Sequence, residues 1–254
     1  MRNYWWVLFC LTLWVSCKEQ QEKTVAFSAQ QIIDKAIEKS GGNFIEGKEI
    51  CFDFRGKEYI SARKDWNYRL QRVVIDSFGA TVHDILSNRG FTRYENNKEV
   101  ILPDSLITKY SNSVNSVHYF AYLPYGLNDK AVQKELLKQT DINGMPYFVI
   151  KVTFSEENGG DDFEDVFLYW IHTGEFTVDY LAYEFHTNGG GLRFREAYNP
   201  RMVNGIRFVD YRNYKPRSKK ATLYDLEKLF KANKLDLLSN IELENIYVQS
   251  CPDC

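Results

Sequence analysis

The sequence has 254 residues, of which 44% are hydrophobic and 26% are charged, and its formal net charge is −2. A chain of this length suits one domain of the larger all-β kind, or at most two. Its hydrophobic content argues against a disordered protein. No dense stripe of Lys or Arg appears, and nucleic-acid binding needs clustered positive charge that neutralises phosphates. We therefore expect a folded protein with no nucleic-acid partner.

The first residues are typical of a targeting segment. Arg2 precedes an almost wholly apolar run of twelve residues from Tyr4 to Val15. Spanning a bilayer takes roughly 18 to 20 such residues, so the pattern predicts a signal peptide over 1–16 rather than a membrane-spanning helix. Residues 17–27 begin with Cys17 and continue as a mostly polar stretch, which predicts a tether.

The end of this segment, Trp14-Val15-Ser16-Cys17, resembles the lipobox of bacterial lipoproteins, although Trp14 stands where Leu is usual. The resemblance implies that Cys17 receives diacylglycerol, so that acyl chains of the palmitate kind anchor the protein to a membrane. The implied location is the outer membrane of the cell envelope, on its periplasmic or surface face. The alternative is a plain secretory signal that leaves Cys17 free.

Two cysteines end the chain as Cys251-Pro252-Asp253-Cys254. A redox pair normally opens a helix, and a zinc site needs two further ligands nearby, and neither context is present. We expect a local disulfide or an idle tail, and we predict no metal or cofactor.

Three helices are predicted from capping signals and apolar spacing. The first begins at Ser28, whose capping box with Gln31 precedes Ile32, Ile33 and Ala36 at helical spacing, and Gly41-Gly42 ends it. The second opens at Pro103-Asp104, and the third at Thr222. Between them, alternating patterns and turn signals such as Asn143-Gly144 predict antiparallel strands. These strands cover residues 50–55, 68–75, a hairpin within 80–102, 134–142, 147–154, 164–172, 176–186, 192–198 and 206–214.

The segment 164–186 is unusual because both faces of its strands are apolar. Val166 to Ile171 has no polar face, and in 176–186 both alternating sets of side chains are mainly apolar. An antiparallel sheet normally exposes one face to water. Helices can cover one face here, so the other must pack against a second sheet or line an apolar cavity.

This order of elements resembles the lipoprotein-localisation-factor fold of LolA and LolB. The resemblance implies a mainly β (α+β) domain over 28–254, in which a few helices close a single strongly curved antiparallel sheet, a half-barrel. The hollow of that fold accepts acyl chains. The chain is also similar to a family of uncharacterised Bacteroidota envelope lipoproteins. The matching stretches are Ser113–Phe120, Tyr169–His172, Asp179–Tyr183 and Arg193–Arg201.

The candidate ligand-binding residues combine aromatic rings with paired charges. Arg193 and Arg195 share one strand face and suit a carboxylate or phosphate head group, although a solvated strand face with ion pairs is the alternative. Aromatic residues such as Tyr122, Trp170 and Tyr183 line either a hollow or an ordinary core. The full predicted set is His118, Tyr122, Trp170, His172, Asp179, Tyr183, Arg193, Arg195 and Glu196.

No motif of a known catalytic class is present. The leading hypothesis is a non-enzymatic envelope lipoprotein that binds an acyl chain, from a lipid or a lipoprotein, in the hollow of the half-barrel. The second is a structural or interaction lipoprotein with a filled core. The third is an envelope hydrolase that pairs His118 or His172 with Asp179 or Glu196 as acid and base.

Overall fold

The computed structural model describes residues 27–65, 67–157 and 163–251. The predicted signal peptide, Cys17 and most of the predicted tether lie outside these residues. Three α-helices are described: α1 (Ala29–Lys39), α2 (Asp104–Ala121) and α3 (Leu226–Lys231). Short 3-10 turns are η1 (Gly42–Phe44), η2 (Tyr125–Asn128), η3 (Thr187–Gly189) and η4 (Leu223–Asp225).

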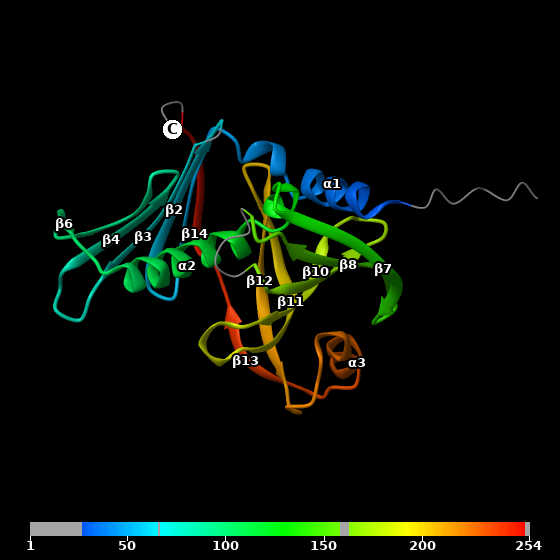
Figure 1. The fold of residues 1–254 in the computed structure, drawn as a ribbon. Coiled ribbons are helices and arrows are strands. Elements are labelled where there is room, and N and C mark those ends of the chain that lie inside the picture. Colours follow the sequence, from blue (N-terminus) through cyan, green and yellow to red (C-terminus); the bar gives the residue numbers. More distant parts are fainter. Residues whose placement is uncertain (1–26, 66, 158–162, 252–254) are drawn as a thin grey trace, which may run out of the picture.

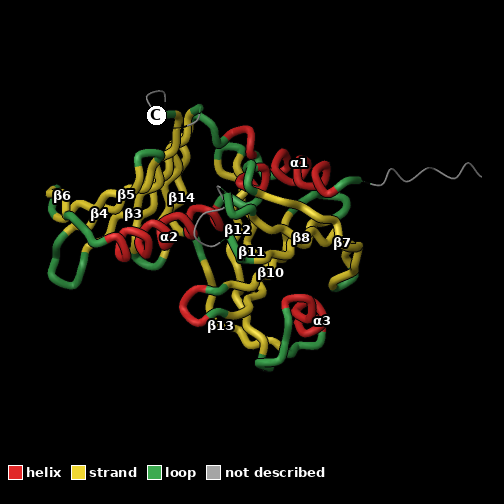
Figure 2. Tube along the Cα trace, in the orientation of Figure 1, coloured by secondary structure: helices red, strands yellow, loops and turns green. Residues whose placement is uncertain are grey.

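Fourteen strands make up most of the described chain (Figures 1 and 2). The first six are β1 (Lys48–Phe54), β2 (Lys57–Lys64), β3 (Asn67–Ile75), β4 (Thr81–Ser87), β5 (Gly90–Glu95) and β6 (Lys98–Val100). After α2 follow β7 (Val132–Ile142), β8 (Met145–Phe154), β9 (Val166–His172), β10 (Val178–Phe185), β11 (Gly191–Val203), β12 (Ile206–Pro216), β13 (Leu235–Ile241) and β14 (Glu244–Ser250). The mainly β, antiparallel fold with few helices is confirmed.

The strands form two sheets, where one continuous curved sheet was predicted. Sheet A has the order β14-β1-β2-β3-β4-β5-β6, and sheet B has the order β13-β12-β11-β10-β9-β8-β7. The chain passes from sheet B to sheet A at Leu243, where side chains replace a neighbouring strand. Asp210 accepts a hydrogen bond from the Leu243 N–H at 3.0 Å, and Arg201 donates to the Leu243 carbonyl. Because these backbone groups are already satisfied, the strand ladder ends there.

Local signals explain the helix starts and the main hairpin. The Ser28 side chain accepts from the Gln31 N–H and the Gln31 side chain accepts from the Ser28 N–H, which is the predicted capping box. Thr222 and Asp225 form a second capping box before α3. Asn143 and Gly144 have φ angles of 55° and 81°, as a two-residue hairpin turn requires.

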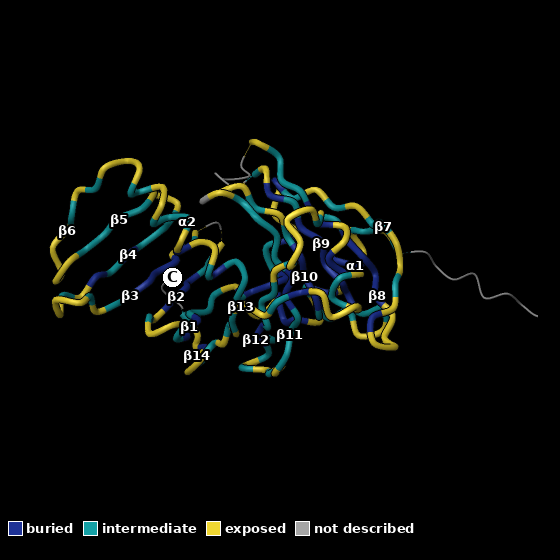
Figure 3. Tube along the Cα trace, turned by 90° about the horizontal axis from the view of Figure 1, so that it is seen from below, coloured by how far each residue is buried: buried dark blue, intermediate teal, exposed yellow. Residues whose placement is uncertain are grey.

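The strands with two apolar faces are covered on both sides. On one face of sheet B, Phe167, Tyr169 and Ile171 of β9 join a core with α1 and the end of α2. On the other face, Leu168 and Trp170 pack with η4 and α3. In Figure 1, α3 lies away from α1 and α2. Figure 3 shows burial concentrated in the strands of sheet B, whereas β5 and β6 of sheet A are mostly intermediate or exposed.

The sequence indicated no strand after the third helix, and the structure adds β13 and β14 there. Each is the edge strand of its sheet. Leu235 in β13 and Val248 in β14 are their only fully buried residues. An edge strand that buries so few side chains shows little alternation of apolar and polar residues, so its sequence does not indicate a strand.

The cysteines differ in state. Cys251 is disulfide-bonded, in agreement with the predicted disulfide, whereas the Cys51 thiol is free. Burial raises the Cys51 pKa to about 11, helped by the neighbouring Glu49 and Glu58. Within the described part of the chain, no helix has the length and apolarity needed to cross a membrane.

Candidate functional site

A hollow of about 950 Å³ lies between α2 and the face of sheet B that contacts α1 and α2. Its apolar wall consists of side chains from β1, β8, β9, β10, β12 and β13 together with the C-terminal turn of α2. The aromatic members of this wall are Phe54, Tyr119, Phe120, Phe154, Phe167, Tyr183, Phe185 and Tyr211. The described side chains therefore leave open space where the two-sided strands predicted either a cavity or a second packing layer.

Aromatic contacts fix the shape of this wall. The ring of Tyr183 lies 5.3 Å from that of Phe167 and 5.4 Å from that of Phe120, centroid to centroid. Next to them, the Tyr119 and Tyr169 hydroxyls are hydrogen-bonded at 3.0 Å. Burial raises the pKa of the Tyr211 phenol to about 12, so this group is neutral at any physiological pH. The wall is thus mainly aromatic, and only a few of the residues that line the hollow are charged.

Arg195 is the chemically unusual residue of the hollow. Arg195 is only 8% exposed, yet no carboxylate of a described residue lies within ion-pair distance of its guanidinium. The guanidinium lies over the Phe120 ring, 3.8 Å from the centroid, and donates one hydrogen bond to the Tyr183 hydroxyl at 2.8 Å. Its Nε is buried without a hydrogen-bond partner. Since a buried charge is normally paired, this arrangement has an unused capacity for an anion.

Other charged groups of the hollow are mainly positive. Arg193 extends from the same face of β11, with its guanidinium 4.8 Å from the Phe185 ring centroid. Arg55 and Lys109 also line the hollow, and Asp165 is its one acidic residue among those described. The chain as a whole is slightly acidic, so this excess of cations is local. Such a lining attracts anions.

Of the nine predicted ligand-binding residues, the structure brings Tyr183, Arg193 and Arg195 together in the hollow. His118 and Tyr122 instead face sheet A. The His118 Nε2 donates to the Gln71 carbonyl at 3.0 Å, and its Nδ1 lies 3.3 Å from the Tyr122 hydroxyl, which is bonded to Ser61. Both residues attach α2 to sheet A and line no part of the hollow.

Trp170 and Glu196 lie on the opposite face of sheet B from the hollow. Trp170 is buried beneath α3 and its indole N–H donates to Glu227 at 3.3 Å. Glu196 accepts hydrogen bonds from Arg212 and from the Tyr214 hydroxyl. Strand alternation separates them from Arg195, because neighbouring residues of a strand point to opposite faces. Neither residue lines the hollow.

His172 and Asp179 both lie outside the hollow. His172 stabilises a turn, and Asp179 forms an ion pair with Arg207. The His172 Nδ1 accepts from the backbone N–H groups of Gly174 and Glu175, and Asp179 lies 3.5 Å from Arg207. Asp179 also accepts from the Tyr147 hydroxyl. Neither His118 nor His172 has a hydrogen bond to Asp179 or Glu196, so the acid–base pair of the hydrolase hypothesis is not formed.

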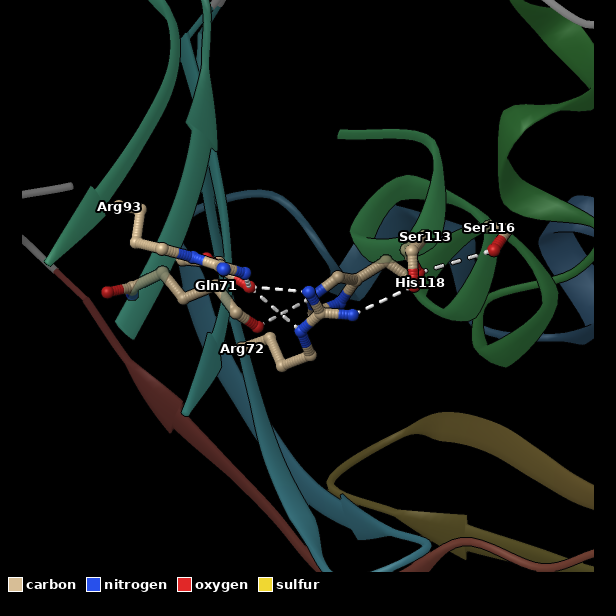
Figure 4. A network of polar contacts seen from close by, with 7 residues as sticks. Gln71, Arg72, Arg93, Ser113, Ser116 and His118 are labelled. Carbon is tan, nitrogen blue, oxygen red and sulfur yellow. Dashed lines mark hydrogen bonds and ion pairs between the residues drawn. The ribbon is translucent and has the colours of Figure 1, made fainter. Parts of the chain in front are cut away.

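Two features were missed by sequence reasoning. The first is the polar side chains of α2 that line the hollow, such as Asn112 and Ser116. The second is a charged network in sheet A. Arg72, Asp84 and Arg93 lie directly opposite one another on β3, β4 and β5, and Figure 4 labels Arg72 and Arg93 of this network. The sequence signal that could have revealed the network is the register of the two hairpins that join β3, β4 and β5. Turns centred near Phe78 and near Asn88–Arg89 place these three residues side by side, but only once the turn positions are known.

Within residues 27–65, 67–157 and 163–251, no group of three His, Cys, Asp or Glu side chains is placed to hold a metal ion. Four acidic residues, Asp161, Asp162, Glu164 and Asp165, follow Gly159-Gly160 in the sequence. Asp161 and Asp162 lie outside the described residues.

Several solved structures are similar to this chain. A LolA superfamily protein from Nitrosomonas europaea has 14% sequence identity and a TM-score of 0.46, over 90% of this chain and 96% of that chain. A putative outer membrane lipoprotein-sorting protein domain from Vibrio parahaemolyticus has 9% identity and a TM-score of 0.41, over 80% and 99%. A DUF1329 family protein from Desulfovibrio piger has 9% identity and a TM-score of 0.40, over 87% and 93%.

No curated protein matches the sequence. A family description matches residues 3–243, and the chain belongs to that family, the family of unknown function DUF6503. The family description assigns no function, so a function for the hollow has to be inferred from the residues of this chain.

Proposed function

We propose that this DUF6503 protein is a non-enzymatic envelope lipoprotein that binds an anionic amphiphile, with an acyl chain in the hollow and an acidic head group at Arg195 and Arg193. The acyl chain belongs to a lipid or to a lipoprotein. The observation that carries this proposal is the guanidinium of Arg195, which is buried in an aromatic hollow with an unpartnered Nε and with no carboxylate of a described residue in an ion pair with it.

The size and lining of the hollow suit such a ligand. Ligand pockets typically enclose about 300 to 1,000 Å³ and are lined by apolar and aromatic side chains with a few placed polar groups, and this hollow encloses about 950 Å³. Each CH₂ group transferred from water into an apolar lining contributes about 0.8 kcal/mol. An acyl chain therefore supplies affinity, while the arginines supply orientation and charge selectivity.

The head-group side of the hollow favours an acid over a neutral lipid. A guanidinium offers hydrogen-bond donors and no acceptor, so its natural ligand is a carboxylate or phosphate. Because the aromatic rings around Arg195 exclude water, an ionic hydrogen bond there is stronger than the same bond at the surface. A neutral ester would leave the positive charge uncompensated.

Binding is tested by displacement of a fluorescent fatty acid from purified protein, with native mass spectrometry of any copurifying lipid. We expect Arg195→Met to weaken binding of the fatty acid about tenfold or more, because one ionic hydrogen bond is lost from a desolvated site. Arg212→Met is the matched control, since Arg212 lies on the neighbouring β12 and pairs with Glu196 on the other face. Equal binding by wild type and Arg195→Met, or no binding at all, contradicts the proposal.

The membrane anchor is a separate part of the proposal and rests on the lipobox-like ending at Cys17. We propose that the lipid on Cys17 holds the domain at the outer membrane through the tether. Intact mass of the protein from its native membrane is expected to show diacylglycerol-modified Cys17. Cys17→Ser is expected to release the protein into the soluble fraction. An unmodified Cys17 in the mature protein would overturn the anchor and leave the hollow unaffected.

A further inference from the structure

We propose that a second pocket, on the sheet A side of α2, binds a phosphate group. This pocket, called here the α2 pocket, encloses about 330 Å³ and is lined by side chains of β2, β3, β4, β5 and α2. It lies apart from the aromatic wall of the hollow, and only Lys109 and Ser113 of α2 line both. No part of the acyl-chain proposal uses it.

The base of the α2 pocket is a nearly buried network of one carboxylate and two guanidiniums. The Arg72 Nε donates to Asp84 Oδ2 at 3.0 Å, and the Arg93 Nε donates to Asp84 Oδ1 at 2.7 Å. The side chains of Arg72, Asp84 and Arg93 are 7%, 1% and 11% exposed. One carboxylate therefore serves two permanently charged guanidiniums, as Figure 4 shows for the arginines and their partners.

The charge of the α2 pocket is unbalanced by its own residues. Among the described residues, its lining contains four cationic side chains, Lys57, Arg72, Arg93 and Lys109, and one carboxylate, that of Asp84. Asp84 compensates one guanidinium, which leaves the second without a counter-charge in a nearly buried place. Burying an unbalanced charge is unfavourable, and a bound anion removes that penalty. An anion with more than one negative charge fits this excess better than a halide or a carboxylate.

The donors of the α2 pocket are held in place before any ligand arrives. The Arg72 Nη1 donates to the Ser113 hydroxyl at 2.8 Å, which ties β3 to α2. Because that hydroxyl accepts from Arg72, its own hydrogen is available to an acceptor in the pocket. The Arg93 guanidinium is stacked on the Tyr110 ring at 3.8 Å from the centroid. Fixed guanidinium and hydroxyl donors with two flanking lysines match the oxygens of a phosphate.

Two sources supply the same phosphate chemistry. One is free inorganic phosphate or a small phosphate monoester. The other is the head group of a phospholipid whose chains occupy the hollow, reached past Lys109 and Ser113, which line both spaces. The two sources predict the same dependence on Lys57, and only the phospholipid competes with a fatty acid for the hollow.

The first arm of the test titrates purified protein with inorganic phosphate at low ionic strength, by calorimetry. We expect saturable binding at one site, weakened about fivefold or more by Lys57→Gln through loss of one charged donor. Lys48→Gln is the matched control, because it makes the same charge change on β1 of the same sheet, where Lys48 bonds Ser250. Lys109→Gln, on the exposed side of α2, provides a second variant should Lys57→Gln fold poorly.

The second arm uses dioctanoyl phosphatidic acid as the probe. Binding weakened by Lys57→Gln, together with displacement of the fluorescent fatty acid by this probe, supports the phosphate in the α2 pocket with chains in the hollow. Dependence on Lys57 for inorganic phosphate alone supports a free phosphate site. The inference is overturned if neither probe depends on Lys57 or Lys109, or if Lys48→Gln weakens binding as much. Failure of fatty-acid binding contradicts the proposed function and leaves the inorganic phosphate arm standing.

Discussion

Two groups of buried arginines flank α2, and they differ in what balances their charge. On the sheet A side, Arg72 and Arg93 both donate to the carboxylate of Asp84, and Arg72 also donates to the Ser113 hydroxyl. On the sheet B side, Arg195 contacts aromatic rings and the hydroxyl of Tyr183. Arginine side chains therefore belong to a polar network on one side of α2 and to an apolar hollow on the other.

The difference indicates that the two groups of arginines contribute differently to the stability of the fold and to ligand binding. A carboxylate shared by two arginines stabilises the folded chain, because removing it leaves both charges unpaired. A guanidinium without a counter-ion contributes little to the empty protein and becomes useful when an anion arrives. We expect substitutions of Arg72, Asp84 and Arg93 to act mainly on folding, and substitutions of Arg195 to act mainly on ligand affinity.

The largest expected effect is that of Asp84→Asn. The substitution keeps the shape and removes the only charge that balances Arg72 and Arg93 within their network. We expect the free energy of unfolding to fall by about 3 to 5 kcal/mol, measured by urea denaturation. Asp236→Asn is the control, because Asp236 pairs with Arg217 on the exposed surface and should change stability by less than about 1 kcal/mol. Equal effects at the two positions would remove the distinction.

The sequence predicted the parts of this molecule that depend on neighbours in the chain. The Ser28 capping box, the Asn143-Gly144 turn and the two apolar faces of β9 are local patterns, and the structure contains each of them. The hollow followed from the third pattern, since strands that are apolar on both faces need two covers.

The features that the sequence did not predict depend on pairing between distant segments. The division into two sheets depends on side chains that satisfy the backbone at Leu243, from strands far away in the sequence. The candidate site was too broad because aromatic and charged residues were grouped by chemistry alone. Trp170 and Glu196 have suitable side chains and point to the wrong face, which strand alternation together with the pairing register decides.

The second prediction concerns the attachment of α2 to sheet A through His118. Burial lowers the pKa of His118 to about 4, below its usual 6.5, although the hydrogen bond to the Gln71 carbonyl opposes the shift. The unfolded chain therefore binds a proton at a higher pH than the folded chain. The contribution to stability is complete above pH 6.5 and is lost as the pH falls toward 4, by about 3 kcal/mol.

This pH dependence is measured as the free energy of unfolding between pH 7 and pH 4. The variant His118→Gln retains a donor toward the Gln71 carbonyl and cannot titrate, so its stability should fall less steeply over that range. The difference in slope between the two proteins isolates His118 from carboxylates that titrate in both. Parallel curves would mean that His118 does not carry the dependence. No comparable histidine lines the hollow among its described residues.

The smallest expected effect on stability is that of Arg195→Met, and it tests the comparison most directly. Methionine has a similar length and flexible shape, so it fills the space beside Phe120 without the uncompensated charge. We expect the empty protein to keep its free energy of unfolding or to gain about 1 kcal/mol, even though the Tyr183 hydroxyl loses a donor. Arg72→Met, in contrast, leaves Asp84 with one partner and Ser113 without its donor, and should destabilise the protein clearly. If Arg195→Met is as destabilising as Arg72→Met, then the Arg195 guanidinium stabilises the empty protein. Its charge would then give no support for anion binding in the hollow.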